Sequence, residues 1–129
     1  MTDTVRTAGP ALADTPPSGM VVMLYEETVA SLTRAVESVS NGDLAGRNRH
    51  AARAADIIEL LYGCLDMQRG GEIAANLERL YRMVLGRLVV LNAGRDPQPG
   101  REAIELLNPL LQAWSSIDRK HRDGIAAAA

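Results

Sequence analysis

This chain of 129 residues has one cysteine, few aromatic residues and no large excess of either charge. A single cysteine, Cys64, excludes an internal disulfide, and the two histidines, His50 and His121, lie too far apart to suggest a zinc site. The formal net charge of -2 lacks the positive field that binding to a nucleic-acid backbone requires. We therefore expect a protein of a reducing compartment that binds no metal, no cofactor and no nucleic acid.

Long apolar runs are missing as well. No stretch approaches the roughly 20 consecutive apolar residues of a membrane span. Residues 1–18 carry two aspartates and three prolines and have no apolar centre, which is not the pattern of a signal peptide. These absences predict a cytosolic protein without a membrane span.

Apolar residues recur at spacings of three and four in four segments, which predicts four helices with one buried face each. In chain order the stripes are Met20, Leu24, Leu32, Ala35, Val36 and Val39; Leu44, Ala51, Ala55, Ile58 and Leu65; Ile73, Leu77, Leu80, Val84, Leu88 and Leu91; and Ala103, Leu107, Leu110, Trp114 and Ile117.

Residues that favour turns separate these helices. Asn41-Gly42 ends the first helix, because both residue types tolerate the left-handed conformation, and Asp43 can cap the second. Residues 92–100, rich in glycine and proline, form the loop before the fourth helix. Pro109 lies inside the fourth stripe and removes a backbone donor, so we expect a bend there and a helix restarted with Asn108 as its cap.

These segments predict an all-α fold, an antiparallel up-down four-helix bundle with a flexible N-terminal tail. Residues 1–17 form the tail, because they hold too few large apolar groups to offset the entropy lost on ordering. Residues 18–118 form the bundle domain, and residues 119–129 form a frayed C-terminal tail. Phenylalanine is absent, so leucine, valine, isoleucine and alanine fill the core.

Side chains that could catalyse a reaction are scattered. The adjacent carboxylates Glu26 and Glu27 point about 100° apart on a helix, so we expect a solvated face and not a shared acid-base site. Gly70-Gly71 lacks the strand and the Lys-Ser/Thr pair of a phosphate-binding loop. Cys64, inside an apolar run, is expected to be a small buried hydrophobe. We therefore expect no enzymatic activity.

His50 supports an alternative function. It is followed by a cation at Arg53 and a small residue at Ala54, an arrangement faintly similar to the site of a histidine phosphotransfer domain. An exposed or packing histidine is the more common explanation of such a residue. Phosphotransfer through His50 stays as the second hypothesis.

The most informative feature is an excess of apolar residues. The ranges Met20–Tyr25, Ile57–Met67 and Leu80–Leu91 are apolar over most of the helix circumference, more than a bundle helix needs. Antiparallel packing would bring much of this excess to one end of the bundle. There it forms either a well-buried core or a groove that receives an amphipathic helix of a partner.

Several motifs in these regions occur in a characteristic order. They are Met23-Leu24-Tyr25-Glu26, Asn41-Gly42-Asp43, Asn48, Ala55-Asp56-Ile57-Ile58-Glu59-Leu60, Leu65-Asp66-Met67, Gly70-Gly71-Glu72-Ile73-Ala74-Ala75-Asn76-Leu77, Leu80-Tyr81, Arg87-Leu88, Asn92 and Trp114. Over about residues 17–118 the sequence resembles the FliS family of flagellar export chaperones.

This resemblance implies a small helical chaperone of the bacterial cytoplasm without ATPase activity. Its partners would be the C-terminal segment of flagellin, whose premature polymerisation it prevents, and the flagellar export apparatus. We expect at most a weak homodimer when the protein is free. Positions that lie both in matching motifs and in the apolar excess are the expected flagellin-binding residues: Met23, Tyr25, Ile57, Leu61, Met67, Ile73, Leu77, Leu80 and Tyr81.

Overall fold

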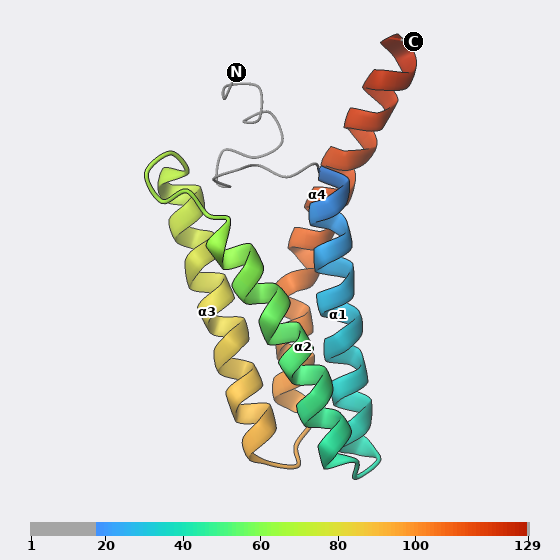
Figure 1. Ribbon diagram of the computed structural model, residues 1–129, viewed down its shortest axis with the longest axis vertical. Coiled ribbons are helices and arrows are strands. Elements are labelled where there is room, and N and C mark those ends of the chain that lie inside the picture. The colour runs from blue at the N-terminus through green and yellow to red at the C-terminus, as the bar shows by residue number, and fades with distance from the viewer. Residues whose placement is uncertain (1–17, 129) are drawn as a thin grey trace.

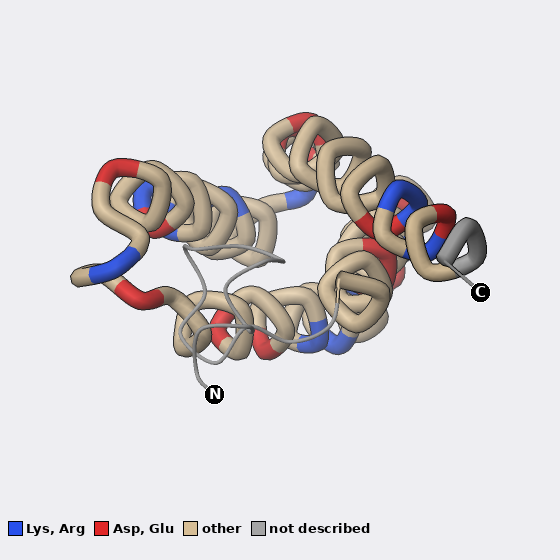
Figure 2. The backbone as a smooth tube through the Cα atoms, turned by 90° about the horizontal axis from the view of Figure 1, so that it is seen from above, with Lys and Arg blue, Asp and Glu red and all other residues tan. Residues whose placement is uncertain are grey.

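Four antiparallel helices make up the part of the chain that the computed structural model describes, residues 18–128. The helices are α1 (Ser18–Ser40), α2 (Leu44–Gly63), α3 (Gly71–Ala93) and α4 (Gln98–Ala128). α1 packs against α2 and α4, and α3 packs against the same two helices, so the four surround a common centre (Figures 1 and 2). The predicted all-α up-down bundle is confirmed; the expected tail, residues 1–17, lies outside the described residues.

The turn between α1 and α2 forms as the sequence predicts. Gly42 adopts a positive φ of 75°, a conformation that costs glycine little. The backbone N–H of Asp43 donates to the carbonyl oxygen of Ser38, and the Asp43 side chain accepts a 2.9 Å hydrogen bond from the N–H of Gly46. Asp43 is therefore the N-cap of α2, and this turn closes the lower end of the bundle in Figure 1.

The expected restart of the fourth helix at Asn108 is wrong, because α4 runs without interruption through Pro109. Both Asn108 and Pro109 are exposed, so the proline ring meets no neighbouring helix. The buried side chains of Leu107 and Trp114 hold the helix to the core on either side of the missing backbone donor. α4 also continues to Ala128, so no helix end marks the expected boundary at residue 118.

A pair of tyrosines joins the two helices that face each other across the bundle. The hydroxyl groups of Tyr25 on α1 and Tyr81 on α3 are hydrogen-bonded, and each side chain is 1% exposed. Each hydroxyl satisfies the other in an interior where an unpaired polar group is costly. The pair therefore fixes the position of α3 relative to α1.

Arg47 links α2 to the end of α3 at the lower end of the bundle. Its side chain is buried and donates a 2.6 Å hydrogen bond to the carbonyl oxygen of Gly94, just beyond α3. A cation at the C-terminal end of a helix is also favoured by the helix dipole. The start of α2 and the end of α3 are thereby joined.

Candidate partner-binding surface

The apolar stripe of α3 is buried at one end of the helix and uncovered at the other. Val84, Leu88 and Leu91 are at most 3% exposed, whereas Ile73, on the same helix face, is 55% exposed. Leu77 and Leu80, which lie between them on this face, are half-buried. At the start of α3 the neighbouring helices cover the side that carries Ala74, which is 0% exposed, and leave the side that carries Ile73 uncovered.

The uncovered part lies where the helices diverge. In both views the connection between α2 and α3 stands apart from the start of α1 and the second half of α4 (Figures 1 and 2). Large apolar side chains that are 42% to 66% exposed lie on all of these segments. We call this set the apolar end surface; its members are Met20, Met23, Leu60, Met67, Ile73 and Ile117.

Three of these six side chains are methionines, whose flexible thioether chains adapt to irregular apolar partners. The other exposed large apolar residues lie elsewhere: Met83 is in the middle of α3, Val89 and Val90 are near its lower end, and Ile125 is near the C-terminal end of α4, beyond the last residue of its stripe. Most of the exposed large apolar side chains therefore lie at one end of the bundle, but some lie elsewhere.

The nine residues expected to bind flagellin fall into three groups. Met23, Met67 and Ile73 are exposed, and Leu77 and Leu80 are half-buried. The remaining four are at most 9% exposed and belong to the core: Tyr25, Ile57, Leu61 and Tyr81. The stripe pattern could not separate these groups, because core and surface residues of one helix share the same spacing.

Three members of the apolar end surface were not among the expected binding residues. Met20 and Leu60 lie inside the apolar ranges noted in the sequence, and Ile117 is the last residue of the α4 stripe. For Met20 and Ile117 the available signal was a position at the end of a stripe, since stripe ends are the first to extend past a neighbouring helix. Leu60 lies outside the α2 stripe, and its only signal was the apolar range that contains it.

Polar contacts hold α2 and α3 together next to this surface. The Tyr62 hydroxyl donates a 2.6 Å hydrogen bond to the Glu78 carboxylate, and Arg82 contacts the same carboxylate at 3.0 Å. The hydrogen bond from Tyr62, with support from Arg82, lowers the pKa of Glu78. Burial raises the pKa of both Tyr25 and Tyr81, so neither hydroxyl is poised to act as an acid or base near neutral pH.

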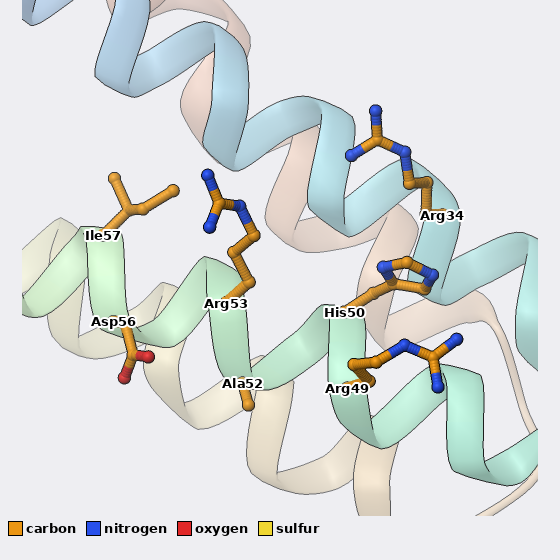
Figure 3. Close-up of a pocket in the computed structure, with 7 residues that line it drawn as sticks. All are labelled: Arg34, Arg49, His50, Ala52, Arg53, Asp56 and Ile57. Atoms are coloured by element: carbon orange, nitrogen blue, oxygen red, sulfur yellow. The ribbon is translucent and has the colours of Figure 1, made fainter.

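Two shallow hollows lie between α1 and α2 and share Arg53 and Ile57 in their lining. We call the two together the α1–α2 furrow. The hollow nearer the apolar end surface is lined by Met23, Leu24, Glu26, Glu27, Ala30, Arg53 and Ile57. The second hollow, shown in Figure 3, is lined by Arg34, Arg49, His50, Ala52, Arg53, Asp56 and Ile57.

Glu27 differs from the solvated carboxylate that the sequence suggested. It is half-buried and accepts a 2.8 Å hydrogen bond from Nε of Arg53, with Arg34 at 3.7 Å. The bond from Arg53 is the main cause that lowers the pKa of Glu27. Glu26 is exposed, as expected.

The other candidate sites have little chemical organisation. Within residues 18–128 no three His, Cys, Asp or Glu side chains lie together as a metal site would require. Within the same residues, no helix is long and apolar enough to cross a membrane. Cys64 is half-buried at the C-terminal end of α2 and packs against the core, less deeply than expected.

Sequence comparison with known proteins identifies the family of this chain. The sequence profile of the family described as "Flagellar protein FliS" matches residues 7–121. The chain belongs to the FliS family. The match covers all of α1, α2 and α3 and most of α4.

Curated relatives of this FliS-family protein are named flagellar secretion chaperones. The protein of Vibrio cholerae is 30% identical over 86% of this chain and 82% of its own length. The protein of Salmonella typhimurium is 32% identical over 85% and 82%, respectively. FliSB of Pseudomonas aeruginosa is 29% identical over 82% and 84%. The family match to residues 7–121 includes every residue of the apolar end surface.

Proposed function

We propose that this FliS-family protein is a cytoplasmic export chaperone for flagellin. It binds the C-terminal region of flagellin, prevents its premature polymerisation and delivers the subunit to the flagellar export apparatus. The observation that supports this most directly is the apolar stripe of α3, which leaves the core and continues uncovered to Ile73. An exposed apolar stripe of this kind is a suitable binding site for an amphipathic helix of a partner.

The apolar end surface is large enough to drive such binding. Fully covering a large aliphatic side chain contributes about 1.5 to 3 kcal/mol. Six half-exposed side chains therefore offer about 5 to 9 kcal/mol before the costs of association and of ordering the partner are subtracted. A flagellin segment that folds on binding would bury its own apolar face against them, which keeps it from pairing with other flagellin molecules.

The proposed role is one of binding and not of catalysis. The tyrosine pair is buried and neutral, and the carboxylates Glu27 and Glu78 are held by cations or hydroxyl donors. These groups position helices. A flagellin chaperone needs only a surface that binds and later releases its partner.

Titration calorimetry with the C-terminal segment of flagellin tests the binding. We expect a 1:1 complex with a negative heat-capacity change, because apolar surface is buried. Ile73→Asp should weaken the complex by at least about tenfold, since a carboxylate placed in an apolar contact loses its hydration. Val89→Asp is the matched control, because Val89 is 70% exposed on the same helix but lies away from the apolar end surface.

Equal losses for the two variants would show that the apolar end surface is not the binding site. No complex at tens of micromolar would refute the flagellin-binding function itself. The chaperone role has a separate readout: sedimentation of flagellin filaments grown with and without this protein. Export is measured by complementation, in which Ile73→Asp should lower the flagellin secreted and Val89→Asp should restore it fully.

A further inference from the structure

The α1–α2 furrow changes character along its length. On α1 the row Met23, Glu27, Ala30 and Arg34, spaced by four, three and four residues, lies on one helix face beside α2. On α2 the row Arg49, Arg53 and Ile57 runs antiparallel to it. Because the helices run in opposite directions, both rows are apolar near the apolar end surface and cationic toward the lower end of the bundle.

The cationic half is more positive than the protein as a whole. Three arginines and one aspartate line it, whereas the whole chain has a formal net charge of -2. In Figure 3, Arg53 and His50 extend from α2 toward α1 and Arg34 lies on α1, while Asp56 points to the opposite side. Arg34, Arg49 and Arg53 are all exposed. The Glu27 carboxylate accepts a hydrogen bond from Nε of Arg53 and lies 3.7 Å from the guanidinium group of Arg34.

We propose that this cationic half of the furrow binds carboxylate side chains of the partner segment whose apolar part covers Met23 and Leu24. The proposal rests on the flagellin-binding function proposed above and adds to it a polarity of the bound segment: apolar residues lie at the end near Met23, and acidic residues lie toward Arg49. Charge complementarity at the lower end then sets the direction and register in which the segment lies.

Carboxylates of a protein segment fit this hollow better than a nucleic acid or an anionic membrane does. Guanidinium groups match the two oxygens of a carboxylate with paired hydrogen bonds. A phosphate backbone or a lipid surface extends beyond the hollow and would meet a chain of net negative charge. The shared lining residues Arg53 and Ile57 join the cationic half to the hollow that holds the apolar side chains of Met23, Leu24 and Ala30 beside the carboxylates Glu26 and Glu27. A segment of mixed composition suits two hollows of such different lining.

The test measures the affinity of the full-length protein for the C-terminal segment of flagellin at about 0.05 M and about 0.5 M NaCl, where screening lengths differ severalfold. The double variant Arg34→Glu/Arg49→Glu should bind about tenfold more weakly at low salt and lose the salt dependence of the wild type. The control is Arg95→Glu/Arg101→Glu, which reverses two exposed arginines near the α3–α4 connection and changes the net charge equally, from -2 to -6. It should change the affinity less than about threefold.

The neutral double variant Arg34→Gln/Arg49→Gln controls for misfolding, because it removes the two positive charges without adding carboxylates near Glu27. It should give a loss of about threefold. Equal effects of the furrow and control pairs would overturn the proposal, because the charge would then act only at long range. If the affinity is high and changes neither with salt nor with the furrow variants, this inference is refuted, whereas the flagellin-binding function is not. A wild-type protein that binds at neither salt concentration refutes both.

Discussion

Replacing Ile73 with alanine should separate partner binding from stability. The change removes about three methyl-sized groups, worth about 2.4 kcal/mol if all are fully buried. In the free protein the Ile73 side chain is 55% exposed, so the part that a partner would cover is worth about 1.3 kcal/mol. The dissociation constant for the flagellin segment should therefore rise close to tenfold. The part already covered in the bundle limits the loss of unfolding free energy to about 1 kcal/mol.

Leu91 provides the comparison on the same helix face. Its side chain is 0% exposed, so Leu91→Ala removes core contacts and leaves a cavity. The free energy of unfolding should fall by about 2 to 5 kcal/mol, while the affinity of the folded protein changes little. Denaturant titrations give the first quantity and calorimetry with the flagellin segment gives the second, on the same preparations.

The reasoning would be refuted by the opposite pattern. If Ile73→Ala lost more than about 2 kcal/mol of stability and kept its affinity, the first turns of α3 would belong to the core. The exposed stripe would then not be a binding surface, and the proposed location of the partner would be wrong.

Three further variants test the interior and, as a comparison, one exposed glycine. Burial raises the pKa of Tyr25 and Tyr81, so the folded protein keeps protons that the unfolded chain releases. The unfolding free energy should therefore fall above about pH 10, by at most about 1.4 kcal/mol per pH unit for each tyrosine. Denaturant titrations from about pH 9 to about pH 11 should show roughly half this slope for Tyr81→Phe, and an unchanged slope would contradict the assignment. Gly100→Ala should lower stability by about 1 to 2 kcal/mol, because its new Cβ would lie 2.5 Å from Cγ2 of Val36. Gly63→Ala, which meets no atom within 4 Å, should be neutral or stabilising by up to about 1 kcal/mol, as thermal melts can check.

The local signals in the sequence were reliable where the responsible interaction is itself local. The Asn41-Gly42 turn and the Asp43 cap formed as expected, since a positive φ and an N-cap hydrogen bond involve only residues a few positions apart. Pro109 is the exception. Its missing donor predicted an interrupted helix, yet packing of Leu107 and Trp114 kept α4 continuous.

The candidate site shows the limit of such signals more clearly. Ile73 and Leu91 are equivalent in a helical repeat, and no spacing rule distinguishes them. One is exposed and the other is buried, because the α2–α3 connection diverges from α1 and α4 at one end of the bundle. The α1–α2 furrow is a similar case, since its arginines on α1 and α2 are far apart in sequence.

The sequence by itself therefore determined the four helices, their turns, the all-α class and the resemblance to FliS, because periodicity, capping and ordered motifs are properties of contiguous residues. Only the tertiary structure decided that Tyr25 and Tyr81 pair inside the bundle while Met23 and Ile73 stay outside. The physical reason is that burial depends on which helix covers which face, and that is set by how all four helices pack at once.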